Sequence, residues 1–142
     1  QLITCTGCVK DAEGNVVETI RDMTVNYKKN GMADISLIAA PAKLDDAPLT
    51  GDSTFTHGDC TLYFSVRENL FVPPDYQVSE EEQALSDAGK LNSGYGTAEV
   101  QRNRSQTIYW EDGGVFYTII SFDNTMTAEE FAGMAGEIID LK

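Results

Sequence analysis

Apolar and polar residues alternate along the first third of the chain in a pattern typical of a β-hairpin. The stretch 16–27 reads as a strand and alternates at Met23, Val25 and Tyr27. Residues 28–31 (Lys-Lys-Asn-Gly) then predict a tight turn, because Asn-Gly between β-prone runs is a strong hairpin signal. We expect a return strand over 33–39, which Pro41 ends.

The middle and the last third of the chain predict further strands. Residues 41–59 are rich in Pro, Asp, Thr and Gly without periodicity, so a surface loop is expected there. A strand follows from Cys60, and its apolar character extends to Val72 before two prolines stop it. The β-rich runs 100–110 and 115–122 flank an Asp-Gly-Gly sequence and predict a second hairpin.

Two helices are predicted by capping boxes, in which the first residue and a Glu three positions later bond each other's backbone. Ser79 and Glu82 open a short helix with three glutamates in its first turn, and Gly89 suits its end. Thr127 and Glu130 open a second helix. Its apolar side chains recur at helical spacing and predict one buried stripe: Phe131, Met134, Ala135 and Ile138.

This order of elements predicts an α+β fold. We expect one twisted or curved antiparallel sheet with a short acidic helix and a C-terminal amphipathic helix packed on one face. The 142 residues have the size of one domain, so residues 1–142 are expected to form a single α+β domain.

Charge narrows the range of partners. The chain has 10 basic and 23 acidic residues, a formal net charge of −13, and such a field repels phosphate backbones. We therefore expect no nucleic-acid partner. No apolar run is long enough to insert into a membrane. Because the chain starts at Gln1 and not at Met, we expect it to be cut from a longer membrane-anchored or secreted protein, with any anchor upstream.

The three cysteines and the one histidine are the main candidates for chemistry. Cys5 and Cys8 form one pair spaced by two residues, and His57 and Cys60 form another. Together they could hold a structural zinc ion, since four such ligands fill a tetrahedral shell. A disulfide from Cys5 or Cys8 to Cys60 is the favoured interpretation, and thiols without a partner are the third.

Other candidate residues have simpler interpretations. His57 lacks a nucleophile motif and is expected to be an ordinary loop residue. The carboxylates of Glu111 and Asp112 suit a tight turn. Arg102 and Arg104 could contact an anion, although solvent-facing positions on a strand explain them equally well. We therefore expect no enzymatic activity, no catalytic residues, no cofactor and no catalytic metal.

The second half of the chain resembles a known family. The relevant sequences are YQVSEEE at 76–82, GKLNSGYGTAEV at 89–100, YWEDGGVFYTI at 109–119 and TMTAEEFAGMAGEII at 125–139. They resemble the C-terminal extracytoplasmic domains of anti-sigma-factor-like membrane proteins of Gram-positive, mainly clostridial, bacteria. In that family a cytoplasmic segment holds the sigma factor, one helix spans the membrane, and the outer domain is expected to sense a signal or to be processed.

The resemblance implies a non-catalytic extracytoplasmic sensory or regulatory domain of a membrane-anchored protein. Its partner would be a protein or a small-molecule ligand. The alternative is a secreted or surface binding module for a small molecule, a lipid or a peptide, which would use the concave face of a curved sheet.

Overall fold

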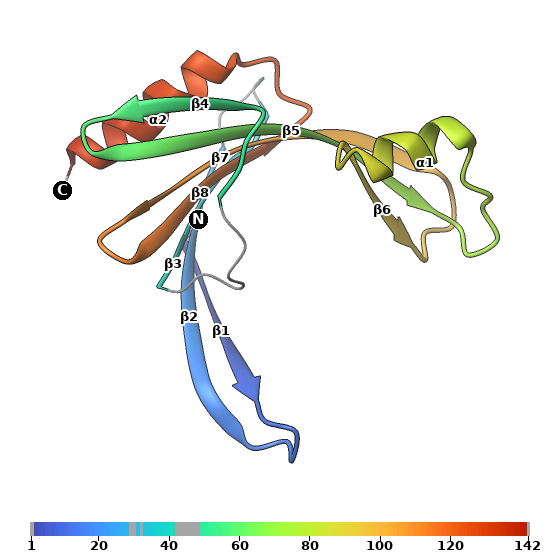
Figure 1. Cartoon of the computed structure of the whole chain (residues 1–142), viewed down its shortest axis with the longest axis horizontal. Helices are drawn as coiled ribbons and strands as arrows, with labels where there is room; N and C mark the ends of the chain where they lie inside the picture. Colours follow the sequence, from blue (N-terminus) through green and yellow to red (C-terminus); the bar gives the residue numbers. More distant parts are fainter. Residues whose placement is uncertain (1, 29–30, 32, 42–48, 142) are drawn as a thin grey trace.

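The computed structural model describes residues 2–28, 31, 33–41 and 49–141, except for the side chains of residues 2–9, 18, 20 and 21. Within these residues the chain forms eight strands and two helices (Figure 1). In chain order they are β1 (Leu2–Lys10), β2 (Val16–Tyr27), β3 (Ile35–Ala40), β4 (Ser53–His57), β5 (Cys60–Val72), α1 (Glu80–Asp87), β6 (Leu91–Tyr95), β7 (Gln101–Asp112), β8 (Val115–Phe122) and α2 (Ala128–Asp140).

The strands form one curved sheet in the order β1-β2-β3-β8-β7-β5-β4. Neighbours in this order are antiparallel, and β6 joins as a parallel partner of the second half of β5. The predicted α+β class with a mostly antiparallel sheet is therefore confirmed. The hairpin of β1 and β2 projects from the rest of the sheet in Figure 1.

Turn chemistry explains the predicted hairpins. Gly113 and Gly114 have φ angles of 61° and 79° between β7 and β8, a left-handed geometry that glycine adopts without strain. The tight turn expected there is present. The pairing of β2 with β3 is also confirmed, although residues 29 and 30 of the expected turn lie outside the described residues.

Three strands, β1, β4 and β6, were not predicted. The loop expected over 41–59 contains β4, which pairs with the start of β5 through a hairpin at Gly58. The strand β6 carries Asn, Ser and Gly at its centre, so it lacks the apolar alternation that marks a strand. The strand conformation of β6 depends on its parallel pairing with β5, which its own sequence does not predict.

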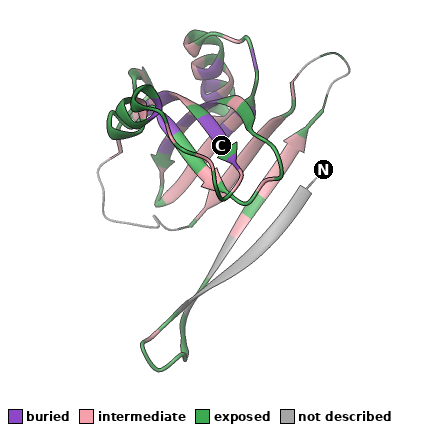
Figure 2. Cartoon of the chain, turned by 90° about the vertical axis from the view of Figure 1, so that its right-hand side faces the viewer, coloured by how far each residue is buried: buried purple, intermediate pink, exposed green. Residues whose placement is uncertain are grey.

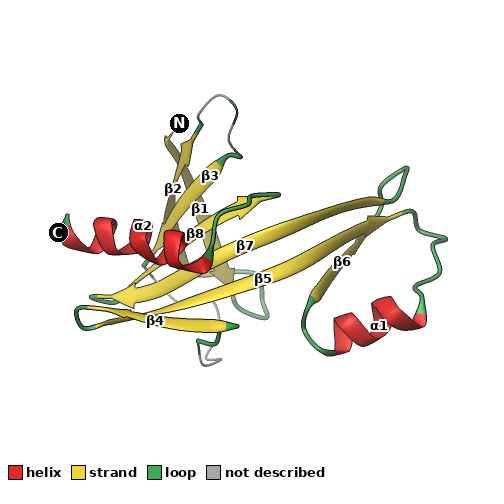
Figure 3. Cartoon of the chain, turned by 90° about the horizontal axis from the view of Figure 1, so that it is seen from above, coloured by secondary structure: helices red, strands yellow, loops and turns green. Residues whose placement is uncertain are grey.

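Two hydrophobic clusters lie along the sheet, each beside one helix (Figures 2 and 3). Under α2 the buried residues are Leu62, Phe64, Ile108, Trp110, Ile119, Phe131 and Ala135. The smaller cluster beside α1 contains Leu70, Val72 and Leu91, against which Tyr76 and Leu85 pack. Both expected capping boxes are present. In the described part of the chain, neither helix is long and apolar enough to cross a membrane.

Between these two clusters the face of β5 and β7 becomes polar. Beneath α2, Phe64 of β5 pairs with Ile108 of β7. Four residues nearer to α1 on each strand, Glu68 pairs with Arg104. The apolar surface resumes at Leu70, beside α1. A charged segment of the sheet therefore separates the two helix-covered regions.

Candidate functional site

The structure brings His57 and Cys60 together and places Cys5 and Cys8 on another strand. His57 pairs with Cys60 across the β4–β5 hairpin, whereas Cys5 and Cys8 belong to β1. In the sheet order β2, β3, β8 and β7 lie between β1 and β5. The side chains of Cys5 and Cys8 lie outside the described residues, so the disulfide and the zinc site stay predictions. No group of three or more metal-binding side chains is found among the side chains that are described.

His57 connects β4 to α2. Its Nε2 atom lies 2.8 Å from Oδ1 of Asp140, and its ring packs on the backbone at Gly136. A Cβ atom added at Gly136 would lie 2.7 Å from Nδ1 of the ring, so the close approach depends on glycine. This geometry gives His57 a structural contact with the C-terminal helix.

Along one edge of β5, Asp52 lies between the segment that pairs with β4 and the segment that pairs with β6. Its carboxylate accepts hydrogen bonds of 2.8 Å from the Val66 amide and from Arg67, and it also pairs with Lys90. Burial acts to raise the pKa of Asp52, but the bonds from Lys90, Val66 and Arg67 together lower it to about 2. The carboxylate is therefore ionised at neutral pH and acts as a structural link.

Glu82 is a second carboxylate with several partners, and it links α1 to β7. It is buried, with 6% of its surface exposed, and it accepts hydrogen bonds of 2.8 Å from the Tyr76 hydroxyl and the Ser79 amide. Arg102 of β7 forms an ion pair with the same carboxylate. The bonds from Ser79, Tyr76 and Arg102 lower the pKa of Glu82 to about 2 and outweigh the opposing effect of burial. The guanidinium of Arg102 is therefore already paired with the Glu82 carboxylate.

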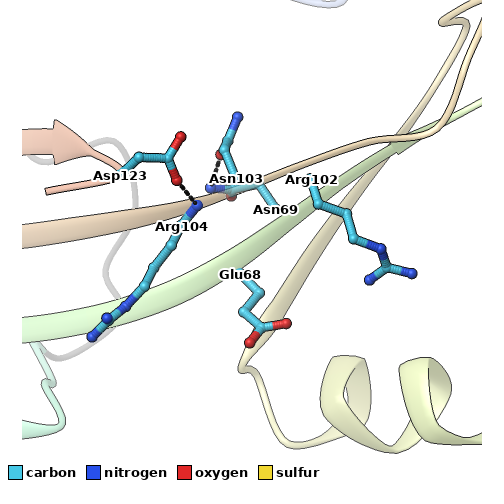
Figure 4. Close-up of a pocket in the computed structure, with 6 residues that line it drawn as sticks. All are labelled: Glu68, Asn69, Arg102, Asn103, Arg104 and Asp123. Carbon is cyan, nitrogen blue, oxygen red and sulfur yellow. Dashed lines mark hydrogen bonds between the residues drawn. The ribbon is translucent and has the colours of Figure 1, made fainter. Parts of the chain in front are cut away.

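A pocket of about 300 Å³ lies next to this ion pair, along β5 and β7 (Figure 4). Its lining residues are Glu68, Asn69, Arg102, Asn103, Arg104 and Asp123. Figure 4 shows Glu68, Arg102 and Arg104 extending from one side of the two strands, and Asn103 and Asp123 from the other. The pocket is thus polar and carries charges of both signs.

The end of β8 shapes this pocket. β8 stops at Phe122, opposite Ser105, so the described sheet leaves β7 without a β8 partner beyond that point. Asp123 then turns away with a left-handed φ of 50°. Its amide donates to the Arg104 carbonyl at 2.7 Å, and its carboxylate accepts the Arg104 amide at 2.9 Å. Asp123 therefore holds the backbone of Arg104 without contacting its guanidinium.

A row of asparagine side chains links the strands that line the pocket, on the face opposite the side chains of Glu68 and Arg104. Asn92 donates to the side-chain carbonyl of Asn69, which in turn donates to that of Asn103 at 2.8 Å. Asn69 also donates to the hydroxyl of Ser105, and both of these residues are buried. These bonds join β6, β5 and β7 side by side, so the backbone that carries the charged residues is held in place.

Arg104 differs from Arg67 and Arg102, the other arginines whose side chains are described. Lys28, Arg67, Lys90 and Arg102 each pair with a carboxylate. Arg104 is exposed in the pocket and has no carboxylate partner among the described residues. The Arg-x-Arg spacing indicated a possible anion contact, but the sequence alone could not show that only the second arginine is available.

Comparisons with protein-family models, with curated proteins and with solved structures find no match for this chain. The resemblance to extracytoplasmic domains of anti-sigma-factor-like proteins therefore stays a prediction. The pocket and its charges are the observations that bear on function.

Proposed function

We propose that this chain is a non-catalytic binding domain with a sensory or regulatory role outside the membrane, and that it binds its ligand in the pocket on β5 and β7. The observation that carries this proposal is Arg104, an arginine in a pocket without a carboxylate partner in the described structure. In a chain with a net charge of −13, carboxylates are abundant, so an arginine without one leaves a positive group for a ligand.

Several features support a binding role. The pocket has the volume of the smaller ligand sites found in proteins. The strands that carry its charged residues are joined by a hydrogen-bonded asparagine row, and Arg102 is fixed by Glu82, so the site needs little reordering to receive a ligand. In this proposal the acidic helix α1 and the amphipathic helix α2 support the curved sheet on either side of the pocket.

The sensory role and the extracytoplasmic location rest on the family resemblance. The same pocket would serve the alternative, a secreted or surface module for a small molecule. The encoding gene separates the two: an upstream membrane span preceded by a cytoplasmic segment favours the regulatory protein, and a signal peptide directly before Gln1 favours the secreted one.

Thermal unfolding in the presence of a panel of small charged molecules tests the binding role. A true ligand should raise the Tm of the wild-type protein, because binding to the folded state stabilises it. The rise should be lost in Arg104→Gln. It should be retained in Lys10→Gln, a matched control on the projecting hairpin that also removes one exposed positive charge.

Two outcomes would contradict the proposal. One is that every stabilising compound acts equally on Arg104→Gln. The other is turnover of a compound at this pocket, lost in the same variant, since that would make the site an active site.

A further inference from the structure

Glu68 and Arg104 are an unusual cross-strand pair. They lie directly opposite each other on β5 and β7, where facing side chains have Cβ atoms roughly 5 Å apart. Opposite charges in this position commonly form an ion pair. Here the two charged groups do not approach within 4.0 Å, and Figure 4 shows their side chains diverging.

Neighbouring residues do not neutralise either charge. Arg102 is paired with Glu82 of α1, and the Asp123 carboxylate binds the Arg104 amide. The side chains of Glu68 and Arg104 are both exposed, and neither has a side-chain partner among the described residues. The pocket therefore offers one positive and one negative group, held on adjacent strands.

We infer that the pocket binds a small zwitterion of the amino-acid type, which carries a carboxylate and an ammonium group close together. The ligand carboxylate accepts hydrogen bonds from the Arg104 guanidinium, whose fork geometry suits a carboxylate. The ligand ammonium donates to Glu68. This inference rests on the proposed function and names the ligand class for the same pocket.

Charge explains the preference for a zwitterion. A simple anion bound at Arg104 is repelled by Glu68, and a simple cation bound at Glu68 is repelled by Arg104. A molecule with both charges satisfies the two groups at once. The volume of about 300 Å³ accommodates an amino acid or a similarly small zwitterion.

Blocked analogues of glycine provide matched probes. Glycine has both charges, N-acetylglycine lacks the ammonium group, and glycine methyl ester lacks the carboxylate. Binding is measured for each by titration calorimetry or by chemical-shift changes in the labelled protein. We expect glycine and L-alanine to bind the wild-type protein at least about tenfold more tightly than either blocked analogue, the factor that corresponds to one good charged contact.

Two variants assign the contacts. Glu68→Gln should weaken glycine binding about tenfold. N-acetylglycine should bind this variant at least as tightly as the wild type, because it has no ammonium group to lose a partner and its repulsion by Glu68 is removed. Arg104→Gln should weaken glycine binding by a similar factor, whereas the methyl ester should bind this variant at least as tightly as the wild type, because its repulsion by Arg104 is removed. Lys10→Gln and Glu81→Gln, which remove exposed charges outside the pocket lining, should bind glycine like the wild type. Circular dichroism verifies that each variant is folded.

The possible failures are distinguishable. If acetate or N-acetylglycine binds as tightly as glycine and Glu68→Gln has no effect, the pocket is a simple anion site. The zwitterion inference is then overturned, while the proposed binding function survives. If neither amino acid binds at millimolar concentration, the inference is also overturned. If binding of no charged compound depends on Arg104, the inference and the proposed function both fail.

Discussion

Asp52 and Lys90 lie 38 residues apart in the chain, and their side chains pair where the edge of β5 passes from β4 to β6. Asp52 precedes β4 and Lys90 precedes β6. On either side of this ion pair the backbone continues the sheet, since the Asp52 amide donates to the Phe64 carbonyl and the Glu68 amide donates to the Lys90 carbonyl. One carboxylate thus connects the region under α2 to the region beside α1.

Replacing Asp52 tests this connection. Asp52→Asn should lower the free energy of unfolding at neutral pH by about 1 to 2 kcal/mol. A pKa displaced from 3.8 to about 2 corresponds to at most about 2.5 kcal/mol, and the partial exposure of the side chain reduces that value. Urea denaturation measures the change.

Asp34→Asn is the control for Asp52. Asp34 also pairs with a lysine, Lys28, at 2.8 Å, but both side chains are mostly exposed. We expect a change within about 0.5 kcal/mol. Equal effects of the two substitutions would show that Asp52 contributes no more than a surface ion pair does.

Glu82 should contribute to the dependence of stability on pH. Its pKa is about 2 in the folded protein, compared with an ordinary value of 4.5. A depressed pKa gives stability that is present above the unfolded value and is lost as the pH falls through the folded value. The advantage of the wild type over Glu82→Gln should therefore be largest above pH 4.5 and should shrink steadily towards pH 2.

Urea midpoints measured across this range check the prediction. Glutamine still suits the capping box, so the substitution mainly removes the charge that Arg102 and Tyr76 contact. Glu81→Gln removes an exposed carboxylate from the same helical turn and should give a difference from the wild type that varies little over the same range. A pH profile of Glu82→Gln parallel to that of the wild type would contradict the assigned pKa.

Local signals in the sequence predict much of this fold. Ser79 with Glu82 and Thr127 with Glu130 identify both helix starts, because a capping box involves residues only three positions apart. The β7–β8 hairpin is equally local, since its two glycines determine the turn. The strand β6 was missed because its partner, β5, is separated from it by α1.

The candidate site was not predictable for the same reason. The pairing of Glu68 with Arg104 depends on the register of β5 against β7, and a shift of one residue would place them on opposite faces. The difference between the two arginines also depends on Glu82, which forms its ion pair with Arg102 and leaves Arg104 without a carboxylate partner in the described structure. The sequence identified the two arginines as possible anion contacts but could not distinguish them.

The packing of α2 can be tested at Phe131. This side chain is fully buried, and its ring lies 5.6 Å from that of Phe64, measured between centroids. Phe131→Ala should lower the free energy of unfolding by about 3 to 5 kcal/mol, as expected when a buried aromatic ring is removed from a core. Leu141→Ala, at a residue that is 85% exposed, should change it by less than about 0.5 kcal/mol. An unchanged denaturant midpoint for Phe131→Ala would show that α2 is not part of the core.

Two glycines of α2 test the contact with His57. Alanine is favoured over glycine inside a helix by about 1 kcal/mol, and a Cβ added at Gly133 meets nothing within 4 Å. Gly133→Ala should therefore stabilise the protein by up to about 1 kcal/mol. At Gly136 the added Cβ would lie 2.7 Å from the His57 ring, so the ring, which also contacts Asp140, must shift to make room. Gly136→Ala should consequently stabilise the protein less than Gly133→Ala, or destabilise it.

The double variant His57→Ala, Gly136→Ala identifies the cause of this difference. Without the ring, alanine at position 136 has room, so adding Gly136→Ala to His57→Ala should stabilise the protein as much as Gly133→Ala stabilises the wild type. Thermal and urea unfolding of the four variants provide the comparison. If Gly136→Ala already stabilises the wild-type protein as much as Gly133→Ala does, His57 does not pack on this helix. The contact between β4 and the end of α2 would then have to depend on other residues.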